Sequence, residues 1–146
     1  MEIKDPNINE TFDQIIKLAE EKKMLNQIAI SSFHHKYYDL VYKYNKEHNE
    51  KIEFGFLYCD QRDDIFVPYR FDTKGCSMNI YQGDVTKEIV KKAHENGIAV
   101  LCWFKMVDEE NENIYQRLFD CNVDGICCNE PNKAKEFRDK LYEMSN

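Results

Sequence analysis

Two charged residues near the amino terminus, Glu2 and Lys4, have the types and the spacing of a small binding site. They flank Ile3, and residues i and i+2 of a β-strand share one face, so the carboxylate and the ammonium would point the same way. A carboxylate can bind a hard cation such as Ca²⁺ or Mg²⁺, and an ammonium can neutralise negative charge. The residues alone leave two interpretations open: a frayed, exposed end without a role, or site residues from an element whose beginning is missing.

The cysteines and histidines, in contrast, do not have the spacing of a metal site. No CxxC pair occurs among the six cysteines, so the usual zinc spacing is absent. The adjacent His34 and His35 would point to opposite sides of a strand, which makes a poor chelate. We expect no zinc site, and we expect the cysteines that lie in apolar runs to be buried thiols that pack as small hydrophobes: Cys59, Cys102, Cys127 and Cys128.

Length and charge exclude several classes of protein. The 146 residues are enough for one domain. The net charge of −7 gives no electrostatic basis for binding nucleic acid or an anionic membrane. The longest apolar runs, such as residues 98–104, are far shorter than the roughly 20 residues of a membrane span. No signal peptide is recognisable at the amino terminus, so we expect a cytoplasmic protein without a transmembrane segment.

Short apolar segments and amphipathic segments of helical length alternate along the chain. After the first strand at 2–4, the predicted strands are residues 28–33, 52–59, 76–80, 98–104 and 123–128. The predicted helices are residues 11–25, 36–48, 86–97, a segment around 114–119, and 131–143. Thr86 is a plausible N-cap, Gly97 a helix end and Pro131 a helix start. Residues 60–75 break the alternation and are expected to form a loop or a short irregular helix.

Strands separated by helices indicate parallel pairing through right-handed crossovers, and therefore an α/β fold. The strands are mostly apolar, as expected where both faces of a sheet are covered. Two architectures remain open, an open doubly wound sheet or part of a (β/α) barrel. No glycine-rich phosphate loop follows any strand, which argues against a nucleotide-binding domain.

The order of short motifs resembles the second half of the glycerophosphodiester phosphodiesterase family. The chain has E-I-K at 2–4, S-S-F at 31–33, A-H-E-N-G at 93–97 followed by Trp103, and V-D-G-I at 123–126 followed by Pro131. The resemblance covers nearly the whole chain. It implies a TIM-type barrel that hydrolyses glycerophosphodiesters to an alcohol and glycerol 3-phosphate with a divalent cation. The fold expected for residues 1–146 is therefore α/β, the C-terminal portion of a TIM-type (β/α) barrel.

The chain departs from the family pattern in four ways. Phe104 stands where the family usually has Thr, Asn122 where it has Gly, and Asn129 where it has Asp. The fourth departure is larger, because the family's first half is absent from the chain. That half contains the H-R-G strand, the metal-binding E-x-D pair and a second catalytic histidine.

The resemblance also implies roles for individual residues. It makes Glu2 a ligand of a divalent cation, Ca²⁺ or Mg²⁺, and Lys4 the catalytic residue that contacts the phosphodiester. Trp103 would line the glycerol or alcohol pocket, and Ser32 would support substrate binding. His94 lies one turn before Gly97 on a predicted helix and is expected to be structural, and a loop hydrogen bond is the expected use of Asp124.

A divalent cation held by one carboxylate would bind weakly, so we expect the isolated chain to be inactive or nearly so. Three hypotheses follow. The chain is the C-terminal part of a phosphodiesterase that pairs with a missing N-terminal half. Alternatively, it is a non-catalytic half-barrel that forms a homodimer to cover its open sheet edges. The third hypothesis is an unrelated open α/β domain of the flavodoxin type.

Overall fold

A single sheet of six parallel strands forms the centre of the protein, for which a computed structural model describes residues 1–59 and 76–144. The strands pair in the order of the sequence: β1 (Glu2–Ile3), β2 (Ala29–Ser32), β3 (Glu53–Tyr58), β4 (Ser77–Tyr81), β5 (Ala99–Trp103) and β6 (Gly125–Cys127). Each predicted strand segment therefore forms a strand. The segment 60–75, predicted as a loop or an irregular helix, lies outside the described residues.

Helices connect most of the strands, and 3₁₀ turns follow two of the elements. The helices are α1 (Ile8–Glu21), α2 (Tyr37–His48), α3 (Lys87–Glu95), α4 (Glu112–Asp120) and α5 (Pro131–Met144), and the turns are η1 (Leu25–Gln27) and η2 (Gln82–Asp84). None of the helices in the described part of the chain is long and apolar enough to cross a membrane.

The first helix begins earlier than its apolar pattern predicts, at Ile8 instead of residue 11. The cause is the carboxylate of Asp5, which accepts the backbone N–H of Asn7 at 2.8 Å and the hydroxyl of Thr11 at 2.8 Å. An acidic side chain that holds donors of the first turn stabilises a helix start.

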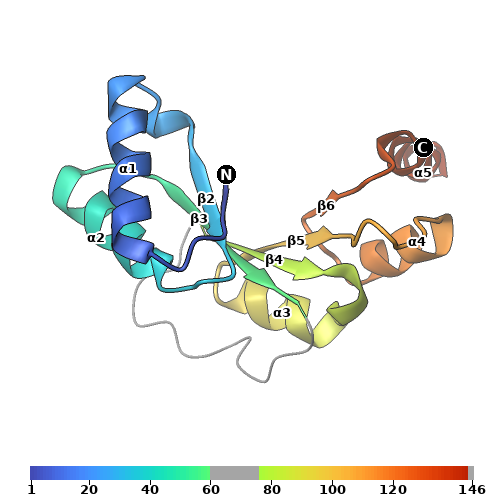
Figure 1. The fold of residues 1–146 in the computed structure, drawn as a ribbon. Helices are drawn as coiled ribbons and strands as arrows, with labels where there is room; N and C mark the ends of the chain where they lie inside the picture. Colours follow the sequence, from blue (N-terminus) through green and yellow to red (C-terminus); the bar gives the residue numbers. More distant parts are fainter. Residues whose placement is uncertain (60–75, 145–146) are drawn as a thin grey trace.

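The strand order decides between the two architectures that the sequence left open. A doubly wound sheet reverses its strand order at a switch point, whereas these strands pair strictly in sequence. Right-handed crossovers between consecutive neighbours place every helix on the same face of the sheet. Figure 1 shows the helices in an arc, from α1 and α2 past α3 to α4 and α5. The described residues therefore form part of a (β/α) barrel, as predicted, and not a flavodoxin-type domain.

The two faces of the sheet differ in their side chains. The face under the helices is buried and apolar, with Ile30, Phe54, Met78 and Val100 in one core with the helices. The opposite face, here called the open face, is built from the alternate residues of each strand. At its centre the strand register aligns small and polar residues: Glu2, Ser31, Gly55, Ser77 and Ala99. The expectation of strands that are apolar on both faces is therefore met only on the helix side.

The open face is concave. A Cβ atom added to Gly55 would lie 3.3 Å from Cβ of Ser31, closer than the roughly 4.8 Å between neighbouring strands. The rings of Phe33 and Trp103 meet with centroids 6.3 Å apart. Their strands β2 and β5 are separated by β3 and β4, about 14 Å on a flat sheet. Side chains that converge in this way require a sheet curved like the wall of a barrel.

Several helix ends form as the sequence predicts. The Thr86 hydroxyl accepts the N–H of Ile89 at 3.2 Å and caps α3, and Gly97 follows that helix with φ of 69°. Asn122 also adopts a left-handed backbone, with φ of 63°. Asn tolerates this conformation better than other residues with a side chain. The left-handed backbone at this position suits Asn122 as well as a Gly.

The cysteines divide into buried and accessible thiols. Cys102 is fully buried, as predicted, and burial raises its pKa to about 12. Cys59 and Cys128 are half-buried, and Cys127 is exposed. The prediction of a buried thiol is wrong for Cys127 because β6 is the last strand of the described sheet, so its side chain lies at an uncovered edge.

Candidate functional site

The carboxyl ends of parallel strands meet at one edge of a sheet, which is where barrel enzymes place their sites. Lys4 follows β1, Ser32 ends β2 and Trp103 ends β5. The structure therefore brings these three predicted site residues to the same edge. Glu2 lies on the open face beside them, because it pairs in register with Ser31.

Glu2 belongs to a paired strand, and Lys4 follows that strand directly. The amino group of Met1 donates to the carbonyl of Ala29 at 2.8 Å, and the N–H of Ser31 donates to the carbonyl of Met1 at 2.8 Å. Ile3, between the two charged residues, is buried under the helices. Lys4 Nζ lies 3.6 Å from Glu2 Oε1, with the side chains 79% and 39% exposed. The alternation expected from the sequence therefore places both charges at the open face, within reach of a ligand.

Ser32 lies on the other side of the sheet from these charges. Its side chain is fully buried, and its hydroxyl donates to the carbonyl of Ile3 at 2.7 Å and accepts the N–H of His34 at 3.0 Å. The hydroxyl therefore fastens the end of β1 to the end of β2. In this position Ser32 helps to hold the end of β1 beside which Glu2 and Lys4 lie.

Trp103 lies on the open face within a cluster of aromatic rings. Its indole N–H donates to the backbone carbonyl of Asn79 at 3.3 Å, which fixes the ring across β4. The ring of Phe33 meets it edge-on at 6.3 Å, and the ring of Tyr81 lies 5.4 Å away at an angle of 52°. Phe33 follows β2, the neighbour of β1. It therefore lies between the Glu2–Lys4 pair and Trp103.

A second lysine at this edge, Lys105, did not emerge from the sequence. It follows Trp103 by two residues, and its Nζ lies 4.2 Å above the centre of the Tyr81 ring. The Tyr81 hydroxyl donates to Asp108 at 3.1 Å. The sequence did contain a signal for it. Trp103 and Lys105 are two residues apart at the end of a predicted strand, the same spacing as Glu2 and Lys4, so Lys105 could have been expected on the face of Trp103. The motifs of the family do not include it, because residue 105 lies between the strand motif that ends at 104 and the V-D-G-I motif at 123–126.

His94 and Asp124 join two elements away from the site. Nε2 of His94 lies 2.8 Å from Oδ2 of Asp124, and the same oxygen accepts the N–H of Val100 at 2.7 Å. Burial acts to raise the pKa of Asp124, but the hydrogen bonds from Val100 and His94 lower it by more than burial raises it. The net shift of this pKa is therefore downward. The carboxylate therefore links the end of α3, the start of β5 and the start of β6. This confirms the structural role expected for His94 and the loop hydrogen bond expected for Asp124.

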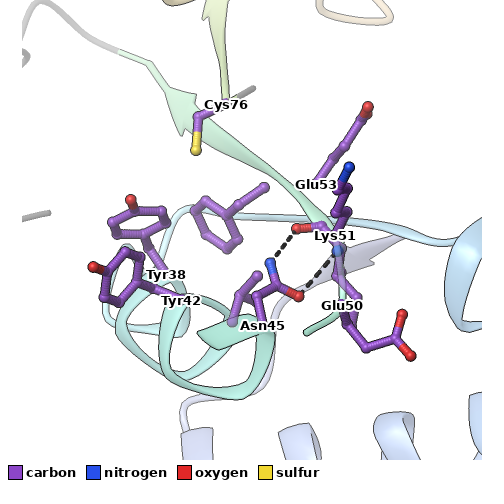
Figure 2. Close-up of a pocket in the computed structure, with 10 residues that line it drawn as sticks. Tyr38, Tyr42, Asn45, Glu50, Lys51, Glu53 and Cys76 are labelled. Carbon is purple, nitrogen blue, oxygen red and sulfur yellow. Dashed lines mark hydrogen bonds between the residues drawn. The ribbon is translucent and has the colours of Figure 1, made fainter. Parts of the chain in front are cut away.

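A cavity of about 380 Å³ lies at the opposite end of the strands (Figure 2). It is bounded by α2 and by the residues before β3 and β4, including Tyr38, Glu50 and Cys76. The side-chain amide of Asn45 donates to the carbonyl of Ile52 at 2.9 Å and accepts its N–H at 3.0 Å, as Figure 2 shows. These two bonds fix the connection between α2 and β3. The amino ends of barrel strands usually serve stability, so we do not assign the site to this cavity.

The described residues do not by themselves fit a divalent-cation site. Among residues 1–59 and 76–144, no three His, Cys, Asp or Glu side chains come together closely enough to hold a metal ion. Ca²⁺ takes roughly 6–8 oxygen ligands, and Mg²⁺ also requires a nearly complete octahedral shell. Any such cation beside Glu2 would need further ligands from water, substrate or residues outside this set.

The fold and the motifs agree with comparisons to known proteins. The sequence matches the glycerophosphoryl diester phosphodiesterase family over residues 2–133. No curated protein sequence matches the chain. A structure from Galdieria sulphuraria, assigned as a glycerophosphodiester phosphodiesterase, superposes with a TM-score of 0.71 at 20% identity, covering 93% of this chain and 55% of that one.

A second structure, from Silicibacter pomeroyi DSS-3, is assigned as a glycerophosphoryl diester phosphodiesterase. It superposes with a TM-score of 0.67 at 19% identity and covers 99% of this chain and 50% of that one. The chain therefore spans about half the length of these two proteins. At these identities the two structures establish the fold.

Proposed function

The chain belongs to the glycerophosphoryl diester phosphodiesterase family, and from this premise we propose that it binds a glycerophosphodiester at the carboxyl edge of its sheet. One observation supports this most strongly: Glu2, Lys4 and Trp103 lie on one concave face and at one edge. A small-molecule diester needs a cation for its phosphate and an apolar surface for its carbon skeleton, and these residues offer both.

In this proposal each residue has a distinct role. Lys4 contacts the phosphodiester and neutralises the charge that develops on its oxygens. Trp103 packs against the glycerol or alcohol part, with its ring fixed by the hydrogen bond to Asn79. Ser32 positions β1 through the carbonyl of Ile3. Glu2 contributes one carboxylate ligand toward a divalent cation, Ca²⁺ or Mg²⁺, for which the described residues are not sufficient.

Hydrolysis to an alcohol and glycerol 3-phosphate, a step of phospholipid breakdown, requires more groups than these. A general base or nucleophile must act on the phosphate, and an acid must protonate the leaving alkoxide. We propose that this chain is inactive or nearly so alone and that an N-terminal half, pairing with its open sheet edges, completes the site. A cytoplasmic location is part of the proposal, because buried thiols such as that of Cys102 suit a reducing compartment.

A binding titration tests the proposal. Trp103 is the only tryptophan of the chain, so its fluorescence reports ligand at the site. Glycerophosphocholine in the presence of Ca²⁺ should change this fluorescence in a saturable way. Exposed ion pairs contribute about 0.2–1 kcal/mol, so Lys4→Met should weaken binding by about 1.4- to 5-fold. Lys17→Met, which removes an exposed lysine of α1, is the matched control and should leave binding unchanged. A titration without any saturable change would contradict the proposal.

A second function, a self-associating half-barrel without catalysis, is favoured by the edge at β6. Phe119 and Tyr142 are 56% and 65% exposed there. They border an apolar groove of about 460 Å³ between α4, β6 and α5. A closed barrel has about 8 strands, whereas the described sheet has six. Its two edge strands therefore present backbone groups to which another chain can pair.

A further inference from the structure

Asn79 is a polar residue in the middle of β4, and its side chain lies on the open face. Its neighbours Met78 and Ile80 are buried under the helices, so the side chain of Asn79 points to the other side of the sheet. Its partners in the adjacent strands, Leu57 and Leu101, are apolar. Asparagine is depleted in strands, because it packs poorly on a pleated surface. Its presence in this row therefore needs an explanation.

The carboxamide of Asn79 lies over β3, near the centre of the open face. Its Nδ2 donates to Oγ of Ser77 at 3.0 Å, and a Cβ atom added to Gly55 would collide with the same nitrogen. Gly55 belongs to β3, which lies between β4 and the strands β2 and β1. The amide therefore occupies the space that Gly55 leaves open, on the side of β4 that faces Lys4.

The backbone of Asn79 is part of the aromatic side of the site. Its carbonyl accepts the indole N–H of Trp103 at 3.3 Å, so the position of this ring is tied to the position of Asn79. The ring of Trp103 meets that of Phe33, which follows β2. Asn79 thus holds the indole with its backbone and presents an amide with its side chain. The amide lies over β3, between the strand that precedes Lys4 and the strand that contains Trp103.

The carboxamide has hydrogen-bonding capacity left for a ligand. Among residues 1–59 and 76–144, the hydrogen bond of this side chain is the one to Ser77, whereas a carboxamide has two N–H donors and an oxygen with two lone pairs. No side-chain oxygen or nitrogen of the described residues is both buried and without a partner. Oδ1 of Asn79 is therefore accessible. A hydroxyl group, which donates and accepts, matches such an amide.

We propose that the Asn79 carboxamide binds a hydroxyl group of the glycerol part, and that the site therefore selects glycerol diesters over diesters of a plain alkyl alcohol. This inference rests on the proposed function and adds a specificity-determining residue to it. In this arrangement the phosphate lies at Lys4, the carbon skeleton of the glycerol packs along Trp103, and a hydroxyl meets the amide over β3. A site that hydrogen-bonds a hydroxyl of its ligand rejects the analogue that lacks it.

Two diesters of equal charge and chain length test the inference: glycerophosphocholine and propylphosphocholine, in which hydrogen atoms replace both glycerol hydroxyls. Their affinities are measured with Ca²⁺ by Trp103 fluorescence and by calorimetry. The native chain should bind glycerophosphocholine about fivefold more tightly, the effect of one neutral hydrogen bond. In Asn79→Ala the two should bind equally, because only the affinity for glycerophosphocholine falls. Asn79→Leu, which keeps the volume of the side chain, should behave in the same way. The control Asn26→Ala, at an exposed asparagine of η1, should retain the preference.

The possible failures are distinguishable. Equal affinity of the native chain for the two diesters would overturn the inference and leave the proposed function standing. A preference that persists in Asn79→Ala and Asn79→Leu would overturn it as well. So would an equal loss of affinity for both diesters in these variants, because Asn79 would then act through Trp103 and not through a hydroxyl. If neither diester binds in a saturable way, the proposed function fails and the inference fails with it.

Discussion

At the scale of single residues, the alternation of a strand made Glu2 and Lys4 predictable, whereas the placement of Ser32 was not. Period-2 geometry puts Glu2 and Lys4 on one face whatever surrounds them. In 31-SSF-33, however, either serine could face the helices, because the choice depends on how β2 pairs with β1. The register places Ser31 on the open face beside Glu2 and buries Ser32. Its predicted role in substrate binding stays a prediction, now through the position of β1.

Ser32→Ala should destabilise the protein by about 1–3 kcal/mol, because it leaves a buried carbonyl of Ile3 and the N–H of His34 without the hydroxyl that pairs them. Ser31→Ala is the matched control. The Ser31 hydroxyl donates to the carbonyl of Met1 over a long distance, 3.4 Å, and near the surface. We therefore expect Ser31→Ala to change the free energy of unfolding by about 0.5 kcal/mol or less. Urea unfolding of the three proteins measures both values. Equal stability of the two variants would show that Ser32 does not fasten β1.

At the scale of elements, the sequence predicted every described strand and helix, with differences at the ends. Thr86, Gly97 and Pro131 mark helix boundaries through local chemistry, and the structure confirms all three. The start of α1 was missed because Asp5 holds Asn7 and Thr11 from outside the apolar pattern. The A-H-x-x-G and V-D-G-I motifs have a structural explanation, since they supply His94 and Asp124, which join α3, β5 and β6.

Asp124→Ala should remove this joint and lower the free energy of unfolding at neutral pH. Hydrogen bonds to a charged group are each worth about 1.5–3 kcal/mol when buried. The Asp124 side chain is 43% exposed, so we expect a loss of about 1–2 kcal/mol after allowing for solvent screening. The control is Asp120→Ala. The Asp120 carboxylate is exposed, and the hydrogen bond described for it comes from Gln116. This variant should change the free energy of unfolding by about 0.5 kcal/mol or less.

The same variant has a predicted pH dependence. The pKa of Asp124 is lowered in the folded protein from its usual 3.8. A carboxyl group with a lowered folded pKa stabilises the protein fully above its unfolded pKa and loses that contribution as the pH falls through the folded value. The stability difference between the native chain and Asp124→Ala should therefore be constant down to about pH 4 and shrink in more acidic solution. A difference that grows on acidification would contradict this assignment.

At the scale of the whole molecule, the strand order and the concave face could not be obtained from residue patterns alone. Alternating strands and helices fit both a doubly wound sheet and a barrel, and only the resemblance to a family favoured the barrel. The decisive features are long-range: sequential parallel pairing, the close approach of Ser31 to Gly55 and the contact of Phe33 with Trp103. Lys105 was missed for the same reason, because its relation to Tyr81 exists only once β4 and β5 pair.

The open edges predict association of the isolated chain. Light scattering after size exclusion should show a mass that rises with protein concentration, because the β6 edge and the exposed ring of Phe119 are available to a second copy. Phe119→Lys should reduce this association. Val107→Lys, at an exposed position in the loop between β5 and α4, is the control and should not. A monomer at every concentration would argue against the self-associating half-barrel.

The central claim is that this chain carries the Lys4–Trp103 side of a glycerophosphodiester site but not a complete catalytic centre. The most direct test is a turnover assay of the purified chain with glycerophosphocholine and Ca²⁺ or Mg²⁺, run on the sample in which Trp103 fluorescence demonstrates binding. We predict saturable binding together with glycerol 3-phosphate release no faster than in a blank without protein. Turnover that is abolished by EDTA and by Glu2→Ala would contradict the claim, because it would show a complete metal-dependent site in this chain.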